Sequence, residues 1–274
     1  MIKQAIIPLA GLGTRLLPLT SVFPKELLPI NGKPGLEYIL EECLDSGIKE
    51  FIFIISDKKK SIKKYFYNDA FFKQIIKKKN NNKSLKKEYE KIKKYKKMIK
   101  FVFQNTPKGT GDALLKCKNL IKDKYFLMLL PDDLIIKNNC SKEMIKLHKK
   151  KKGSIIATKT VSKNTVSRWG ILSFKKKSKS YFKISDVVEK PSVKAAPSNY
   201  AIIGRYILPK SIMNEIKKLK PGKDKEIHIT DAIKNLINNG ERFYGNIFKG
   251  KYLDCGTLKG FINSGIEISK KNKL

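Results

Sequence analysis

The sequence predicts an α/β fold in which a mainly parallel, mixed sheet is flanked by helices. Three observations support this. Short apolar runs alternate with amphipathic segments through residues 1–150, the pattern of buried parallel strands joined by helices. After about Gly153, runs with strand character follow one another more closely. No internal repeat or linker-like segment divides the chain, so we expect one domain with halves 1–150 and 151–274.

The first half contains four apolar runs that we expect to be buried strands. The first ends at a glycine-rich loop, and a helix is expected after it, because apolar residues recur at helical spacing from Pro34 to Ser46 and Gly47 then stops the pattern. A lysine-rich helical region follows the second run. The four expected strands are Gln4–Leu9, Phe51–Ile55, Lys100–Gln104 and Tyr125–Leu130.

Residues 77–100 are low in complexity and rich in lysine. Such a segment cannot bury much apolar surface, so we expect a solvated insertion, part helix and part loop, within the domain. We also expect this insertion to be dispensable for catalysis.

The second half is expected to hold further strands, two amphipathic helices and a closing strand, turn and helix. The expected strands cover residues 153–161, 169–174, 182–190 and 199–208. The helices are predicted from Ser211 to Leu219 and from His228 to Ile237, and the closing unit covers residues 251–269.

The formal net charge of +36 would attract nucleic acid or any other polyanion. However, only four of the 60 basic residues are arginine, the residue that supplies most bidentate contacts to bases and phosphates. Lysine, isoleucine and asparagine are enriched together, which an AT-rich coding sequence produces without selection for binding. We therefore expect solvated lysine-rich faces and no specific nucleic-acid partner.

Nothing in the sequence indicates a membrane span or a secreted protein. No stretch approaches the roughly 18 uninterrupted apolar residues that a span requires. The apolar run at the N-terminus is short and leads into a motif instead of a cleavage site. Four scattered cysteines show neither disulfide nor zinc-site spacing, so a reducing cytoplasm is expected.

Directly after the first strand comes the loop Ala10-Gly11-Leu12-Gly13-Thr14-Arg15. Its glycines allow positive φ and let a phosphate approach backbone N–H groups that a Cβ would block. An arginine beside such a loop suits a triphosphate. Alone, the pattern is often just a tight turn.

A second loop, Phe23 to Pro29, holds Lys25 and Glu26 between two prolines. A rigid loop that presents a lysine near a phosphate site would stabilise the charge that develops during phosphoryl transfer. Standing alone, this segment would be better explained as an exposed Lys–Glu pair.

Taken together, AGLGTRLLPLTSVFPKELLPINGKP closely resembles the N-terminal signature of the sugar nucleotidyltransferase family, in particular its bacterial UTP–glucose-1-phosphate uridylyltransferases. The motifs QNTPKGTGDA, LPDD, WGI, VVEKP, APSNYAIIGRYIL, EIHITDAI and LDCGT follow in the family's order. The resemblance covers nearly the whole chain except the lysine-rich segment.

The resemblance implies a Rossmann-like fold whose strand-rich second half binds the sugar phosphate. The implied reaction joins UTP and glucose 1-phosphate into UDP-glucose and pyrophosphate, assisted by Mg²⁺, in a protein that we expect to be a homo-oligomer. Two polyanions must meet in this reaction, so alignment and charge neutralisation should dominate the barrier.

The resemblance also assigns roles to residues. Arg15 and Lys25 match the positions that clamp the triphosphate, and Lys190 would meet the phosphate of the sugar. Asp132 matches the metal ligand, and Asp254 a second ligand to the same ion. Gln104 is placed to read the uracil edge. The nucleotide-binding set is Ala10, Gly11, Gly13, Thr14, Glu26, Gln104 and Gly109, and the sugar-phosphate set is Gly170, Glu189, Lys190 and Gly204.

The chain departs from the family pattern in two places. The family's G-L-G-H-A reads Gly109 to Ala113 as GTGDA, and His228 replaces a glutamine, which we interpret as polar surface. Two alternatives stay open. One is a thymidylyltransferase or another nucleotidyltransferase, although Glu26 stands where the thymidylyl branch tends to have glutamine. The other is a lysine-rich nucleic-acid-binding protein on an old enzyme fold.

Overall fold

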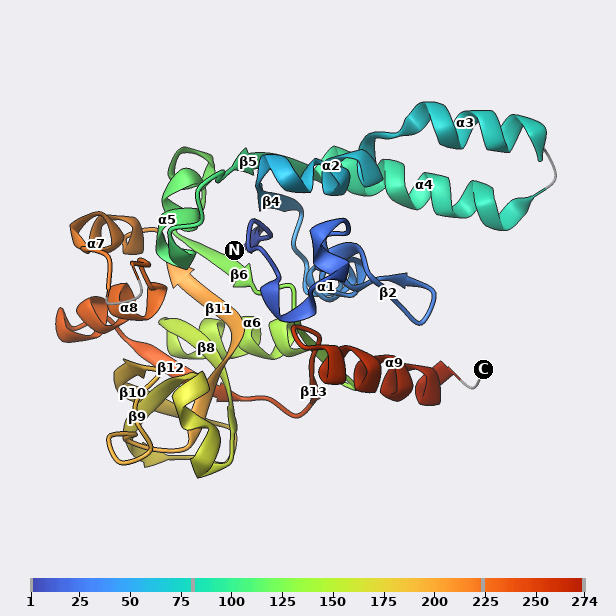
Figure 1. Ribbon diagram of the computed structural model, residues 1–274. Helices are drawn as coiled ribbons and strands as arrows, with labels where there is room; N and C mark the ends of the chain where they lie inside the picture. The colour runs from blue at the N-terminus through green and yellow to red at the C-terminus, as the bar shows by residue number, and fades with distance from the viewer. Residues whose placement is uncertain (1, 80–81, 223–224, 273–274) are drawn as a thin grey trace.

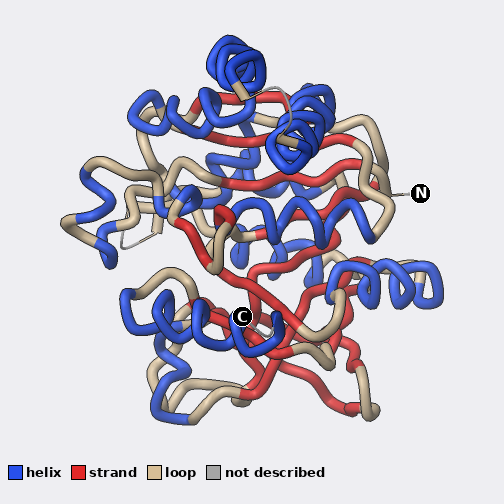
Figure 2. Tube along the Cα trace, turned by 90° about the vertical axis from the view of Figure 1, so that its right-hand side faces the viewer, coloured by secondary structure: helices blue, strands red, loops and turns tan. Residues whose placement is uncertain are grey.

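The structure, a computed structural model, describes residues 2–79, 82–222 and 225–272. Within these ranges, nine strands form one mixed sheet in the order β5-β4-β1-β6-β11-β8-β12-β10-β9 (Figures 1 and 2). The first four strands in that order are parallel, and β11 is antiparallel to both of its main neighbours. The predicted α/β class with a mainly parallel, mixed sheet is confirmed.

The strands of this sheet are β1 (Gln4–Pro8), β4 (Glu50–Ile55), β5 (Ile99–Phe103), β6 (Tyr125–Leu129), β8 (Ser154–Thr160), β9 (Gly170–Lys177), β10 (Tyr181–Glu189), β11 (Tyr200–Pro209) and β12 (Phe243–Ile247). Two small ribbons lie outside it: β2 (Pro29–Ile30) with β3 (Lys33–Pro34), and β7 (Asp133–Ile136) with β13 (Lys251–Asp254).

The helices are α1 (Gly35–Asp45), α2 (Lys60–Tyr67), α3 (Asp69–Lys78), α4 (Lys83–Met98), α5 (Gly109–Lys116), α6 (Cys140–Lys151), α7 (Ile212–Lys218), α8 (Ile229–Asn238) and α9 (Leu258–Asn272). Among the residues with a described structure, no helix is both long enough and apolar enough to cross a bilayer.

Helices cover both faces of the sheet, because neighbouring residues of each buried strand point to opposite sides. Ile7 and Phe53 pack on the face covered by α1, α2, α4 and α6. Ile6 and Ile52 pack on the other face, with α5, α7 and α8. The near-continuous apolar runs of the sequence are explained by this burial on both sides.

The apolar runs named from the sequence all form strands, with bounds shifted by one to three residues. Among the strands that the sequence did not predict are β12, which lies between β8 and β10, and β7, which pairs with β13 as an antiparallel ribbon. The closing strand of the sequence prediction is this β13, which pairs outside the main sheet.

The lysine-rich segment 77–100 forms the end of α3, the whole of α4 and the start of β5. The α3–α4 hairpin projects from the body of the molecule (Figure 1). The described residues within 77–84 are exposed, but Tyr89, Ile92 and Tyr95 of α4 are buried against the core. Only the outer part of the segment therefore matches the description of a solvated insertion, because the apolar residues of α4 share one face.

Candidate functional site

The glycine loop leaves the carboxyl end of β1, at the edge where the parallel strands β4 and β5 also end. Ligands of open α/β sheets bind at this edge. Gly13 has a φ of +71°, and a Cβ at Gly11 would meet nothing within 4 Å, so the backbone there is open to a bulky anion. Thr14 and Arg15 follow in a short 3₁₀ turn.

Asp132, just beyond the end of β6, receives two cations from the N-terminal loops. Lys25 Nζ lies 2.7 Å from Asp132 Oδ2, and Arg15 Nη2 lies 3.3 Å from the same oxygen. Burial alone would lower the pKa of Lys25, but the carboxylates of Asp132 and Glu26 outweigh it and the pKa is raised. Burial alone would raise the pKa of Asp132, but the positive charge of Lys25 outweighs this effect, and the pKa of Asp132 is lowered. Both groups are therefore held in their charged forms.

The β7–β13 ribbon brings Asp254 to this place. Its register pairs Asp254 with Asp133, and the amide of Cys255 donates to the carbonyl of Asp132 at 2.7 Å. A Cβ at Gly256 would lie 2.8 Å from Asp132 Oδ2 and 3.2 Å from Asp254 Oδ1. The glycine thus leaves a small space between the two carboxylates.

A hard cation in this space would lie between the two carboxylates and also beside Arg15 Nη2, which is 2.7 Å from the same Cβ position. Magnesium is often bound by one or two carboxylates, with waters and substrate phosphates completing the octahedron. Across the described ranges, no group of three or more His, Cys, Asp or Glu side chains is arranged to hold a metal. An ion between Asp132 and Asp254 would therefore depend on oxygens from a substrate or water.

Asp133 differs from its neighbour, since its carboxylate is buried inside the fold. The hydroxyl of Tyr252 donates to Oδ1 at 2.6 Å, and the amide of Gly204 donates to Oδ2 at 3.1 Å. Burial, and then the charge of Asp132, raise the pKa of Asp133 to about 6. Both carboxylate oxygens of Asp133 are therefore engaged within the fold. Asp132 is the member of this pair whose carboxylate contacts Arg15 and Lys25.

The sugar-side residues predicted from the sequence gather around a cavity of about 290 Å³. Gly170 faces Glu189 across the β9–β10 pair, and a Cβ at Gly170 would lie 3.2 Å from Glu189 Oε2. Lys190 follows at a φ of +44°, with its amide donating to Trp169 O at 3.0 Å. The predicted site residues that line this cavity are Arg15, Asp132, Gly170, Glu189, Lys190, Gly204 and Asp254.

Gln104 and Gly109 do not line the cavity but lie next to it. The side-chain amide nitrogen of Gln104 donates to Asp112 Oδ2 at 2.7 Å and to Gly109 O at 3.3 Å. Gly109 has a φ of +93°, and a Cβ there would lie 2.6 Å from Ile227 O. This glycine is required by the close approach of the segment before α8, whatever it contributes to a nucleotide.

The side chain of Glu26 is already engaged, because Lys59 Nζ contacts both carboxylate oxygens at 2.8 and 2.9 Å. The pair is buried, so it anchors the loop that carries Lys25. If Glu26 contacts a nucleotide, its backbone is the part that is available. Ala10 is buried at the end of β1, directly before the open glycines.

Several cavity residues were not identified from the sequence. Tyr252 has no motif of its own and reaches the site only through the β7–β13 ribbon. His228, interpreted as polar surface, lines the cavity at the start of α8. Thr230 is buried there, and its hydroxyl has no hydrogen-bond partner in the described part of the structure. For His228 and Thr230, the available signal in the sequence was their position within the EIHITDAI motif.

Comparison with known proteins gives consistent results. A family profile described as nucleotidyl transferase matches residues 4–271. UTP–glucose-1-phosphate uridylyltransferase from Mycoplasma pneumoniae is 35% identical, over 98% of this chain and 93% of its own. UTP–glucose-1-phosphate uridylyltransferase 2 from Staphylococcus saprophyticus is 36% identical, over 99% and 93%.

Two solved structures have the same overall shape. A UDP-glucose pyrophosphorylase complexed with UDP-glucose superposes with a TM-score of 0.87 at 36% identity, covering 99% of this chain and 100% of the other. The UTP-bound enzyme from Acinetobacter baumannii has a TM-score of 0.89 at 30% identity, with 99% and 94% covered. Nucleotidyltransferases of this kind generally use a divalent metal.

Proposed function

The chain belongs to the nucleotidyl transferase family, and from this premise we propose that it transfers the uridylyl group of UTP to glucose 1-phosphate. The products are UDP-glucose and pyrophosphate. The observation that carries the proposal is the convergence of Arg15 and Lys25 on Asp132, which lines a cavity together with Gly170 and Glu189. A charged phosphate-transfer centre thus adjoins a space with polar walls and room for a sugar.

In the proposed reaction, a phosphate oxygen of glucose 1-phosphate attacks the α-phosphorus of UTP in line. The bond from that phosphorus to the bridging oxygen breaks, and pyrophosphate leaves with the electron pair. Lys25 and Arg15 stabilise the charge that develops on the α-phosphate and on pyrophosphate, while Lys190 holds the attacking phosphate. No proton transfer or covalent enzyme intermediate is required.

Asp132 and Asp254 would hold a magnesium ion in the space that Gly256 leaves open. When bound, the ion would neutralise charge on the phosphate oxygens. Lys25 and the ion would then share the charge of Asp132, which keeps the lysine near the phosphates it must stabilise.

On the sugar side, Glu189 would accept hydrogen bonds from glucose hydroxyls. Gly170 lets Glu189, Ile202 and Thr230 pack closely beside the cavity, since a Cβ there would lie 3.0–3.3 Å from each. The unpartnered hydroxyl of Thr230 supports this assignment, because a buried polar group without a partner costs stability until a ligand satisfies it.

On the base side, Gln104 would present its carbonyl oxygen, since its amide nitrogen faces the acceptor Asp112. A carbonyl accepts from the N3–H of uracil and repels the N3 acceptor of cytosine. Thymine also carries an N3–H, so this contact does not separate UTP from dTTP, and a thymidylyltransferase is the second candidate. The solved structure of a thymidylyltransferase from Bacillus anthracis, 20% identical with a TM-score of 0.75, shares the fold alone.

The experiment that tests the proposal is pyrophosphate release from glucose 1-phosphate and Mg²⁺, with UTP, dTTP, CTP, ATP and GTP compared. Turnover with UTP well above the others supports it. Equal or better turnover with dTTP moves the protein to the thymidylyl branch. No turnover, together with steeply salt-dependent binding to arbitrary DNA, would favour the nucleic-acid-binding alternative. The cytoplasmic location and the homo-oligomeric state are further proposals, tested by cell fractionation and by light scattering.

A further inference from the structure

Arg205 is the largest fully buried side chain in the described structure, and its guanidinium joins two parts of the fold. Nε and Nη2 lie 2.9–3.2 Å from the carboxylate oxygens of Glu42 on α1. Nη1 donates to the carbonyls of Leu130 and Gly204, each at 3.1 Å. Leu130 and Gly204, like Asp132, line the cavity.

The sheet is irregular at the place where Arg205 meets these two carbonyls. The β11–β8 pairing shifts register between Ile202 and Tyr206, so Gly204 lies in a bulge. β6 ends next to this bulge. The amide of Leu130, the residue that follows β6, donates to Gly204 O at 2.8 Å. Gly204 O therefore already has one backbone donor, and Arg205 Nη1 supplies a second donor to it and a donor to Leu130 O. A buried carbonyl without any donor is costly.

The bulge bears directly on the reacting groups. Leu130 lies two residues before Asp132, and the amide of Gly204 donates to Asp133 Oδ2 at 3.1 Å. A Cβ at Gly204 would lie only 2.4 Å from that oxygen, so backbone and carboxylate are already in close contact. Movement of the bulge would therefore move the end of β6 and the metal-side carboxylate with it.

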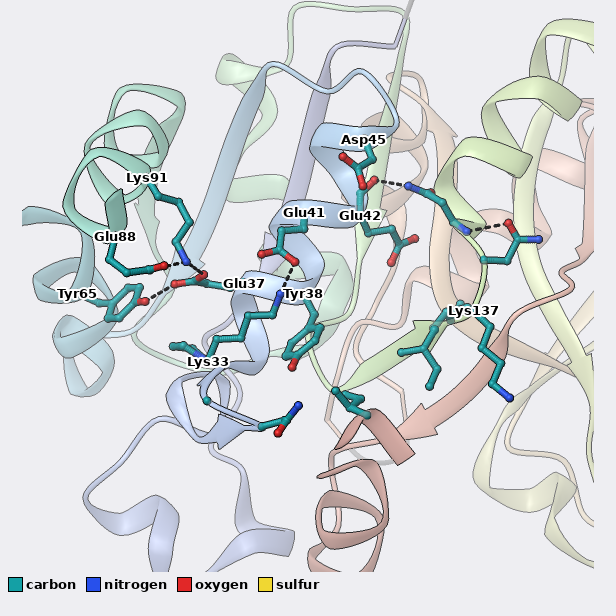
Figure 3. Close-up of a pocket in the computed structure, with 18 residues that line it drawn as sticks. Lys33, Glu37, Tyr38, Glu41, Glu42, Asp45, Tyr65, Glu88, Lys91 and Lys137 are labelled. Carbon is teal, nitrogen blue, oxygen red and sulfur yellow. Dashed lines mark hydrogen bonds and ion pairs between the residues drawn. The ribbon is translucent and has the colours of Figure 1, made fainter. Parts of the chain in front are cut away.

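Glu42 is itself held firmly. Its Oε1 accepts from the amide of Ser141 at 3.1 Å and from the Ser141 hydroxyl, at the start of α6. Figure 3 shows Glu42 on the same helix as Glu37 and Glu41, beside a pocket distinct from the catalytic cavity. The anchor of Arg205 is thus fixed by α1 and α6 together.

We propose that Arg205, anchored by Glu42, is a positioning residue for uridylyl transfer, which fixes the position of Asp132 relative to Gly204 within the lining of the sugar-phosphate cavity. It touches no substrate and acts through the carbonyls of Leu130 and Gly204. The kinetic test of this inference rests on the proposed function. The second test, hydrogen exchange at the amides of Leu130 and Gly204, depends only on the backbone geometry.

The main test replaces the pair with apolar residues of similar volume, in the double variant Glu42→Leu/Arg205→Met. Such replacement leaves no unpaired buried charge, and the Tm of the variant measures the stability lost with the hydrogen bonds to the two carbonyls and to Ser141. The variant leaves both carbonyls without the guanidinium. We expect kcat to fall about 100-fold, as a misplacement of about 1 Å can produce, with the Kd for UTP changed by less than about threefold.

The matched control is Glu37→Leu/Lys91→Met. Glu37 is as deeply buried on the same helix, and pairs with Lys91 at 2.7 Å and with the hydroxyl of Tyr65 (Figure 3). Among the described residues, the hydrogen-bond and ion-pair partners of these two side chains are each other, Tyr65 and Glu88, all outside the site. We expect its kcat to stay within about twofold of wild type, measured well below its Tm, whatever the change in stability.

Arg205→Lys decides the question if the double variant does not fold. An ammonium keeps the charge beside Glu42 but lacks the fork that also reaches two carbonyls, so kcat should fall about tenfold. Hydrogen exchange at the amides of Leu130 and Gly204 should also become faster in this variant. Wild-type kcat, or unchanged exchange at both amides, overturns the proposal.

The two readouts separate this inference from the proposed function. If the wild-type protein releases no pyrophosphate with any nucleotide, the proposed function fails, and the exchange rates still test whether Arg205 holds the bulge.

Discussion

Lys25 Nζ and Asp132 Oδ2 lie 2.7 Å apart, although 107 positions separate the two residues in the chain. One comes from a loop between two prolines and the other from the end of a buried strand. The contact places a cation beside the carboxylate before any substrate binds, so little reorganisation is needed when phosphates arrive.

Lys25→Ala should lower turnover far more than it weakens UTP binding, because the lysine is assigned to charge that develops in the transition state. A loss of about 10²–10³ in kcat is the expected size for one such group. Steady-state kinetics and calorimetric titration with UTP give the two quantities. Lys60→Ala, at an exposed lysine paired with Asp57, is the control. An unchanged kcat would remove Lys25 from the catalytic set.

Gly256→Ala should disable the metal space with little loss of stability. Its Cβ would lie between Arg15 Nη2 and Asp132 Oδ2, which are the flexible ends of side chains and can move. We expect the Mg²⁺ concentration for half-maximal activity to rise at least about tenfold, since the carboxylates would be pushed apart. Gly265→Ala on α9, where a Cβ meets nothing within 4 Å, should behave as wild type. Equal Mg²⁺ dependence in both variants would contradict the assignment.

Gln104→Met should reduce kcat/KM for UTP by about 10–100-fold, the usual effect of removing a buried hydrogen bond to a substrate. The discrimination against CTP should shrink at the same time, because the carbonyl that repels its N3 is gone. Competition assays with mixed nucleotides measure both effects. If selectivity persists unchanged, the base is read elsewhere.

His148 should make the fold sensitive to acid. Its Nδ1 lies 2.8 Å from Gly153 O, and burial lowers its pKa below 6.5. The unfolded chain therefore takes up the proton more readily, and the free energy of unfolding falls as pH drops through that unfolded value. Urea unfolding at pH 7.5 and 5.5 should show a larger loss for wild type than for His148→Gln. Parallel losses would show that this histidine contributes nothing.

The tip of the α3–α4 hairpin should be dispensable. Every described residue in 77–84 is exposed, so replacing this range with a short Gly–Ser turn should leave kcat and KM within about twofold of wild type. Deleting 77–100 entirely should instead prevent folding, since Ile92 and Tyr95 leave the core with it. Solubility, circular dichroism and pyrophosphate release measure these outcomes; lost activity in a folded tip variant would give the tip a functional role.

Local chemistry made part of the fold and site predictable. Apolar runs such as Phe51–Ile55 must be buried on both faces, and this alone implies parallel strands covered by helices. The glycines before Arg15 and the prolines around Lys25 restrict the backbone wherever the segments lie. The order of motifs along the chain then indicated the family, and with it Asp132 and Glu189 as candidate site residues.

Tertiary structure alone decided how these pieces meet. Asp254 reaches Asp132 only because β13 pairs with β7 in one register, and β12 enters the sheet without a strong apolar run. Arg205 carried no signal of its role, since a buried arginine is explained only by the partners that satisfy it. The physical reason is range: propensities and turns act within a few residues, whereas register, bulges and buried ion pairs depend on segments that are distant in sequence.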